Sequence, residues 1–479
     1  MKVYEIVHVT AVLLLASGCG SGTGPAFTPS LFSKAGGDLQ RGPSSAVLPL
    51  PLTVLLKDDA AHAVPGVTVT WSITGGGGSL ASATSVTNAA GMATVSLTLG
   101  PGWGVNTVSA SAASIVQPLV FTATAGVESG GSNVPERYES DLWVANGYAY
   151  TGTWGNRAAS GNALKIWQLG VSGAPALIDS IVTPGFNTLS DVQVSEDNQY
   201  LVFTGEYGPS AGLYVYSLAN PAHPTFLGKS LVPDNGGGLH TGTLSVIGGK
   251  LYAFTARDPG ASNSPAWLIY DLSTPSSPTL ADSVPIPANY GIHDTYVRNG
   301  IAFVCAWNSG VMIYDVGDGR LGGSPSSPKL ISTLVTAGGE VHNAWWFNNP
   351  VTGQAKYLFI GQEGPGTIGS SSRGDIHVVD VSNLATPTEV ASYHMSNTEG
   401  THNFWMDESA QTLYAAYYNG GVVALDVSGT LTGDLASRER ARIQPGGSGN
   451  TYIWGVQLYG NSIYATDMIS GFWQLSVPH

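Results

Sequence analysis

The sequence has little charge and almost no cysteine. Lys, Arg, Asp and Glu make up only 10% of its 479 residues, against roughly a quarter in a typical soluble domain. Of its two cysteines, Cys19 lies in a targeting motif and Cys305 in an apolar strand-like run, so no internal disulfide is expected. The formal net charge of −14 argues against nucleic acid as a partner and against direct attraction to anionic lipid.

Helical periodicity, heptads and long charge runs are also missing, and so are several catalytic signatures. The sequence contains no HExxH, no paired cysteines, no phosphate-binding loop, no G-x-S-x-G and no dinucleotide fingerprint. We therefore assign no catalytic residue and lean against an enzyme, without excluding one. Glycine is abundant, with 63 residues, which is typical of exported all-β proteins that have many tight turns.

The clearest positive signal is a repeat. Ile269–Leu272 recurs as Ile313–Val316, and related phrases end further units along the chain. A second anchor opens each unit, roughly 50 to 60 residues apart, at Ser140, Ser190, His240, His293, His342, His402 and Trp454. Short strands repeated in this way predict a seven-bladed β-propeller over residues 138–479. Because the chain ends on a third strand, Phe472–Val477, the outer strand of the last blade is expected from the segment just before Ser140.

The N-terminus reads as a targeting segment over residues 1–18. An apolar run, Val9–Leu15, precedes Ala16–Cys19, which resembles the lipobox of bacterial lipoproteins. The resemblance implies acylation of Cys19 and a lipid anchor at the outer membrane or cell surface. An ordinary secretory signal, cut near Gly18, is the alternative. Residues 19–29 are expected to form a flexible tether.

Residues 30–126 predict a β-sandwich of about seven short strands, because apolar and polar residues alternate between Gly/Asn turns. Several of its motifs resemble the bacterial Ig-like domain of the intimin/invasin type: Leu48–Val54, Val64–Trp71, Thr87–Gly91, Gly104–Val108 and Phe121–Ala125. The resemblance implies a stalk or spacer, in some members an adhesive module. Residues 127–137 are expected to be a linker.

The repeats themselves resemble the LVIVD-repeat family of surface proteins. Gly291–Asp294, Ile376–Ser382 and Gly420–Ser428 carry the likeness. Three blades depart from it, with Ser140, Ser190 and Trp454 where the family often has histidine. The resemblance implies a propeller at the cell surface and leaves its molecular activity open.

Four of the repeat openings are histidines, in four consecutive units: His240, His293, His342 and His402. The first strand of a propeller blade lines the central channel, so equivalent positions should form a ring there. Converging imidazoles could bind a transition metal or an anionic ligand. The alternative is a structural role, in which each histidine hydrogen-bonds the backbone of a neighbouring blade.

The loops that follow the second strands should lie at the same face of the propeller as the histidines, because the first strand of each blade begins at the edge where the second strand ends. They carry the further candidate ligand-binding residues Glu206, Trp307, Glu363 and Tyr417. The alternative is that these are ordinary polar loops, which bind no ligand and whose aromatic residues pack on neighbouring side chains. Aspartates that close the third strands should instead lie at the opposite edge and cap the next turn: Asp271, Asp315, Asp380 and Asp426.

Three classes of function remain open. The first is a lipid-anchored binding protein of the envelope, whose partner could be an envelope or extracellular protein or a glycan. The second is a metal-dependent enzyme in the manner of propeller oxidases such as methanethiol oxidase, whose cysteine motifs this chain lacks. The third is a structural envelope protein. The first needs the fewest assumptions.

Overall fold

The computed structural model describes residues 28–478 except 114, 132, 134–135, 156, 171–173, 287–290, 365–373 and 396–398. The targeting segment, Cys19 and nearly all of the tether therefore lie outside the described residues. The described chain is built of strands, with a single short 3-10 helix at Ala436–Arg438 (η1). This confirms the all-β prediction. Within the same residues, no helix has the length and apolar character needed to span a bilayer.

The N-terminal domain is a sandwich around one core that includes Trp71 and Phe121, whose rings lie 5.8 Å apart. Its first sheet contains β1 (Leu31–Gly36), β3 (Leu52–Lys57) and β7 (Met92–Val95). The second contains β2 (Gln40–Gly42), β10 (Leu119–Ala125), β9 (Gly104–Ala112), β4 (Thr68–Gly75) and β6 (Thr84–Val86). A short pair joins β5 (Ser79–Leu80) to β8 (Leu97–Thr98). These short strands bring the total above the seven expected.

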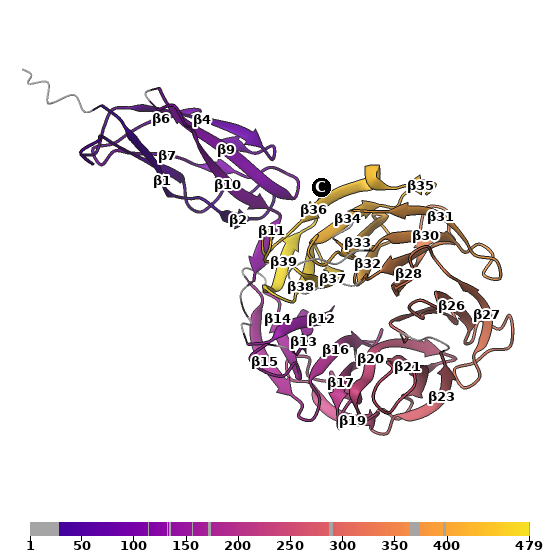
Figure 1. Ribbon diagram of the computed structural model, residues 1–479. Helices are drawn as coiled ribbons and strands as arrows, with labels where there is room; N and C mark the ends of the chain where they lie inside the picture. Colours follow the sequence, from indigo (N-terminus) through magenta and orange to yellow (C-terminus); the bar gives the residue numbers. More distant parts are fainter. Residues whose placement is uncertain are drawn as a thin grey trace, which may run out of the picture.

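The remaining strands form sheets arranged in a ring (Figure 1). In the described residues five of these sheets have four main strands each, and the sixth has eight strands, because two neighbouring sets of four are joined by a further pairing. The innermost strands are β12 (Tyr138–Ala145), β16 (Thr188–Val194), β20 (Asp234–Ile247), β24 (Thr295–Arg298), β28 (Val341–Asn349), β32 (Phe404–Asp407) and β37 (Ile453–Tyr459). The second strands are β13 (Tyr148–Trp154), β17 (Tyr200–Gly208), β21 (Lys250–Arg257), β25 (Ile301–Cys305), β29 (Gln354–Gln362), β33 (Thr412–Ala416) and β38 (Ser462–Asp467).

The third strands are β14 (Ala163–Gln168), β18 (Gly212–Ser217), β22 (Ala266–Asp271), β26 (Val311–Asp315), β30 (Ile376–Asp380), β34 (Val422–Asp426) and β39 (Gly471–Ser476). The outer strands are β15 (Ala176–Val182), β19 (Thr225–Leu231), β23 (Thr279–Pro285), β27 (Lys329–Leu334), β31 (Thr388–Tyr393), β36 (Glu439–Ile443) and β11 (Val127–Gly130). A two-residue strand, β35 (Gly433–Asp434), extends the sheet that ends in β31. Second and third strands are almost wholly buried because they pack between neighbouring sheets.

The ring is closed by the N-terminal side of the chain. Strand β11 pairs antiparallel with β39, with Val127 opposite Leu475 and Gly130 opposite Trp473. The prediction that a segment before Ser140 completes the last blade is confirmed. Part of the stretch expected to be a linker is therefore a strand, and it directly follows the sandwich, which lies at the rim of the ring (Figure 1).

The aspartates at the ends of the third strands cap the turns that follow, as predicted. Oδ1 of Asp271 accepts a hydrogen bond from the backbone N–H of Ser273 at 2.7 Å, and Oδ1 of Asp380 accepts one from Ser382 at 2.9 Å. Asp426 makes the same bond to Ser428 at 2.8 Å. These carboxylates therefore serve the turns and make no dyad with the channel histidines.

Candidate functional site

The structure brings the four predicted histidines into one cluster at the start of four innermost strands. His240 and His342 lie in β20 and β28, whereas His293 and His402 stand just before β24 and β32. Ring centroids are 4.1 Å apart for His240 and His293, 3.7 Å for His293 and His342, and 3.9 Å for His342 and His402. Adjacent imidazoles thus touch, which is close enough for them to share a ligand.

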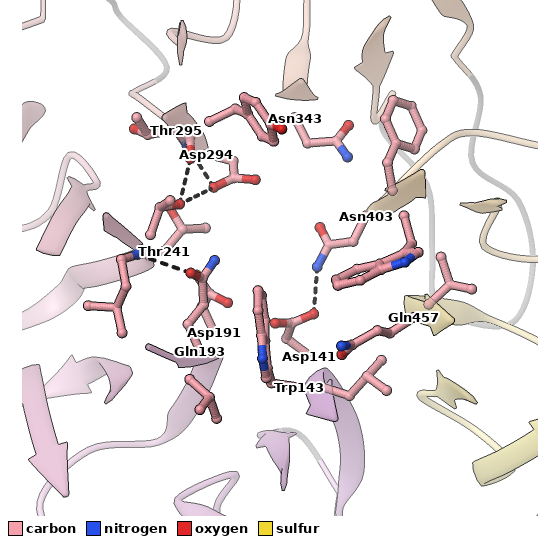
Figure 2. Close-up of a pocket in the computed structure, with 18 of the residues that line it drawn as sticks. Asp141, Trp143, Asp191, Gln193, Thr241, Asp294, Thr295, Asn343, Asn403 and Gln457 are labelled. Atoms are coloured by element: carbon pink, nitrogen blue, oxygen red, sulfur yellow. Dashed lines mark hydrogen bonds between the residues drawn. The ribbon is translucent and has the colours of Figure 1, made fainter. Parts of the chain in front are cut away.

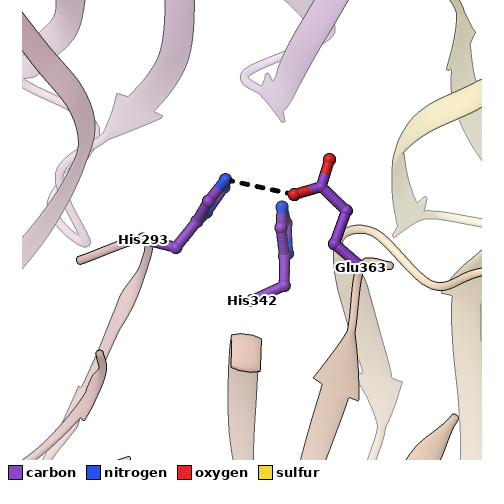
Figure 3. A group of neighbouring side chains, drawn as sticks. All are labelled: His293, His342 and Glu363. Atoms are coloured by element: carbon purple, nitrogen blue, oxygen red, sulfur yellow. Dashed lines mark ion pairs between the residues drawn. The ribbon is translucent and has the colours of Figure 1, made fainter. Parts of the chain in front are cut away.

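Three carboxylates border this cluster, as the strand directions require. Glu206 lies in β17, and Asp258 and Glu363 directly follow β21 and β29. Nδ1 of His240 is 2.9 Å from Oε2 of Glu206 and 3.8 Å from Oδ2 of Asp258. On the other side, Nε2 of His293 is 3.8 Å from Oε2 of Glu363, the ion pair drawn in Figure 3. Glu206 and Glu363 were predicted ligand-binding residues of this edge, whereas Asp258 was expected on the same loops but was not among the candidates.

Burial and the neighbouring carboxylates shift the pKa of His240 in one direction and the pKa values of the other three histidines in the opposite direction. Burial alone would lower the pKa of His240, but the Glu206 carboxylate, aided by Asp258 and Glu363, raises it to about 10. For His293, His342 and His402, burial lowers the pKa well below the usual value, and the neighbouring imidazoles lower it further. The cluster therefore combines one imidazolium with three neutral imidazoles, and the neutral form is the one that binds metals.

The hydrogen bonds of the cluster are incomplete. Nδ1 of His402 lies 2.8 Å from the carbonyl of Trp454 in the next blade, which is the bond expected of a structural histidine. The two ring nitrogens of His342, by contrast, are buried without a hydrogen-bond partner among the described residues, as is Nδ1 of His293. Buried polar atoms without partners are costly and are uncommon unless a ligand or water completes them. A purely structural role accounts for His402 but not for His342.

Two groups in the cluster have the composition of metal sites. Ring nitrogens of His293 and His342 and a carboxylate oxygen of Glu363 all lie within 4.8 Å of one another (Figure 3), and so do ligand atoms of Glu206, His240 and Asp258. Bonds of about 2.0–2.2 Å from one ion to its ligands require those ligands to lie within roughly 4 Å, so small side-chain shifts close either group. Two imidazoles and one carboxylate suit a divalent transition metal and leave coordination positions open.

A cavity of about 300 Å³ lies on the outer side of the histidines. Asp258, Glu363 and several aromatic side chains line it, among them Trp307, whose ring is stacked 5.8 Å from that of His293. Aromatic walls around a few convergent polar groups are the usual composition of a small-molecule site. Loop residues Trp307 and Glu363 therefore lie where they were expected.

Tyr417 does not reach this cavity. Its ring is fully buried within a blade, and its hydroxyl donates a hydrogen bond to the carbonyl of Gly374 at 3.0 Å. The neighbouring Tyr418 lines the cavity instead, and its hydroxyl donates to Oε1 of Glu363. Aligning the repeats so that Asn308 matches Asn419 makes Tyr418, and not Tyr417, the residue equivalent to Trp307. The backbone φ angles of Trp307 and Tyr418 are both positive, at 50° and 38°.

A second, larger cavity lies on the other side of the same histidines, and sequence analysis missed it. Its volume is about 560 Å³, and His240 and His293 border both cavities. The residues one and three positions after the repeat openings line it, among them Asp141, Trp143, Asp191 and Asn403 (Figure 2). The only sequence signal is that these positions alternate along each innermost strand, which places them on the channel side.

Family models match two parts of the chain. Residues 49–124 match the bacterial Ig-like domain (group 1), and residues 371–395 match the LVIVD repeat. The chain has a bacterial Ig-like domain near its N-terminus and an LVIVD repeat within the propeller. Both resemblances inferred from the sequence are confirmed. Bacterial Ig-like domains and LVIVD repeats are typical of extracellular or surface proteins.

Solved structures similar to the LVIVD-repeat chain share little sequence with it. Sqt1 from Chaetomium thermophilum is 11% identical, with a TM-score of 0.48, and the match covers 70% of this chain and 81% of that one. The β-propeller domain of Cps50 (Swd1) from Myceliophteria thermophila is 10% identical, with a TM-score of 0.49 and coverages of 74% and 99%. Such distant likenesses say nothing about ligand or partner. No curated protein matched the chain.

Proposed function

We propose that this LVIVD-repeat chain is a binding protein of the cell envelope, whose propeller holds a divalent transition metal ion at the axial histidine cluster. His293, His342 and Glu363 are the proposed ligands. The observation that carries the proposal is the pair of buried, unpartnered nitrogens on His342, next to a carboxylate at ligand distance. An ion there would satisfy them, and its open positions would face the outer cavity, where a small polar ligand could complete the coordination.

A structural role for the histidines is the main competitor, because the family resemblance makes histidine part of the repeat. In that case each imidazole would contribute one buried hydrogen bond, worth about 1 kcal/mol. The contact of His402 with Trp454 fits this view. Nε2 of His293 also has a partner, Nε2 of His240 at 2.7 Å. The packing of His293 on His342, with ring centroids 3.7 Å apart, does not fit this view, because it leaves Nδ1 of His293 and both nitrogens of His342 without a hydrogen bond among the described residues.

Metal binding can be measured directly. We expect the purified protein to bind Co²⁺ in the visible absorption assay and to release it on Zn²⁺ addition. Changing both His293→Ala and His342→Ala should weaken Co²⁺ binding on the order of 100-fold or more, because two of three ligands are lost. His223→Ala is the matched control, since this imidazole is 62% exposed and pairs only with Asp179 outside the channel. Unchanged Co²⁺ binding in the double variant would remove the proposal.

Anchoring at the membrane is the second part of the proposed function. If Cys19 is acylated, the Ig-like domain holds the propeller away from the membrane surface. Cys19→Ala should then move the protein from the membrane fraction to the soluble exported fraction, as measured by fractionation and immunoblotting. A variant that stays with the membrane, or a mature N-terminus found elsewhere by mass spectrometry, would contradict lipid anchoring.

A further inference from the structure

The larger channel cavity shares His293 with the proposed metal centre and extends from there to the opposite face of the propeller. Its inner end is bordered by His240, His293 and His402, and its outer end by Asn146 and Asn198. These two asparagines are exposed and occupy the turns between first and second strands, with φ of 54° and 58°. The cavity of about 560 Å³ is therefore open at that face and is large enough for a small organic molecule.

Four aromatic rings form one continuous arc of its wall. Trp143 meets Trp405 edge-on with centroids 5.8 Å apart, Trp405 meets Trp345 at 5.5 Å, and Trp345 meets Tyr296 at 5.2 Å. All four line the cavity, and all are only partly buried. The π-faces of such rings carry partial negative charge, which attracts cations that approach them.

Carboxylates occupy the layer between the aromatic arc and the histidines. Asp141 and Asp191, each more than nine-tenths buried, lie beside one another in this layer (Figure 2). Oδ1 of Asp141 accepts a hydrogen bond from Nδ2 of Asn403 at 2.6 Å, and Oδ2 of Asp191 accepts one from the backbone N–H of Gly242 at 2.7 Å. Burial raises the pKa of Asp141 well above its usual range, and the like charge of Asp191 adds to it.

The only positively charged group that borders the cavity among the described residues is the His240 imidazolium. Asp294 and Glu196 add two further acidic side chains, whereas no lysine or arginine borders the cavity. Nδ1 of His240 is paired with Glu206 at 2.9 Å on the other side. Buried carboxyl groups are costly to ionise without a positive partner, which is why the pKa of Asp141 is raised. A cation bound in the cavity would favour the ionised form of Asp141 and Asp191.

Because aromatic rings and carboxyl groups line the same cavity, we propose that it binds an organic cation that carries an alkylated ammonium group. The ammonium would lie against the Trp143–Trp405–Trp345 arc and face the Asp141 and Asp191 carboxylates. Aromatic cages are the usual receptors for such groups. A neutral sugar would find the amides of Asn403 and Gln457 already hydrogen-bonded within the protein, and it would bring no positive charge to the carboxyl groups. The proposal does not depend on a metal at the histidine cluster.

The test uses the exported chain and pairs each cation with a neutral molecule of the same shape. We expect choline and tetramethylammonium to quench tryptophan fluorescence and to give a calorimetric binding signal. Choline should bind at least about tenfold more tightly than 3,3-dimethylbutan-1-ol, its uncharged isostere, since one desolvated cation–π contact is worth about that factor. Absence of binding by either cation at about 10 mM would overturn the proposal, as would equal affinity for the isostere.

Two pairs of variants assign the site. Asp191→Asn should weaken choline binding about tenfold, whereas Asp271→Asn, at a turn outside the channel, should not change it. Trp405→Leu should weaken it by a similar factor, and Trp405→Phe, which keeps an aromatic face, should retain most of it. Thermal denaturation checks that each variant is folded. Binding of D-glucose in place of choline would identify a carbohydrate site and overturn the cation proposal.

Discussion

Replacing Lys165 with methionine is expected to lower the free energy of unfolding by about 3–5 kcal/mol. Nζ of Lys165 lies 2.8 Å from Oε1 of Glu139, and the two side chains are only 3% and 0% exposed. Oε2 of Glu139 has no hydrogen-bond partner among the described residues. Lys165→Met would therefore leave a buried carboxylate with no counter-charge, and urea denaturation at pH 7 measures the loss.

A double variant distinguishes the cost of the unpaired Glu139 charge from the cost of lost packing. The double variant Glu139→Leu with Lys165→Met should recover to within about 1–2 kcal/mol of the parent, because a buried ion pair gains little over an apolar pair of similar size. Lys250→Met is the exposed control: its 3.6 Å pair with Asp271 lies at the surface, with 58% of the lysine side chain exposed. It should change stability by less than about 1 kcal/mol. This account would be contradicted if Lys165→Met lowered the free energy of unfolding only slightly while the double variant lowered it strongly.

The architecture could be predicted because the repeat is visible in the sequence twice per unit. A strand that ends in aspartate fixes the start of the next turn through a bond to the backbone N–H two residues on, so Asp271 and Asp380 mark the same point in two blades. The last unit lacks a fourth strand, which required one from the N-terminal side, and β11 supplies it. Local hydrogen bonding and strand counting were sufficient for both conclusions.

The site was less predictable, because its residues depend on backbone conformation that the pattern does not reveal. The histidines were found since they occupy the same register position. The choice between Tyr417 and Tyr418 depended on a loop residue with positive φ, which turns its side chain toward the channel. The carboxylate layer was missed because Asp141 and Asp191 come from different repeats and form a pair only when the innermost strands β12 and β16 pack side by side.

Asp315→Asn is expected to lower the free energy of unfolding by about 2–3 kcal/mol at pH 7. The Asp315 side chain is fully buried and accepts four backbone N–H bonds. Oδ1 binds Gly317 at 2.9 Å and Asp318 at 3.1 Å, and Oδ2 binds Leu321 at 2.7 Å and Gly323 at 3.0 Å. An asparagine offers an oxygen to only one of these pairs and turns its NH₂ group against the donors of the other.

The same residue gives the effect a defined pH dependence. Burial acts to raise the pKa of Asp315, but the backbone N–H groups outweigh it and lower the pKa from 3.8 to about 2. Because the folded pKa lies below the unfolded one, the stabilisation is fully present above about pH 4 and is lost as pH falls toward 2. The difference between the parent and Asp315→Asn in urea denaturation should therefore shrink by about 2 kcal/mol between pH 5 and pH 2. Asp380→Asn, which keeps an oxygen for its single turn bond and loses only the surface ion pair with Lys356, should cost less than about 1 kcal/mol. A gap between parent and Asp315→Asn that stays constant with pH would show that the carboxylate charge is not what holds this turn.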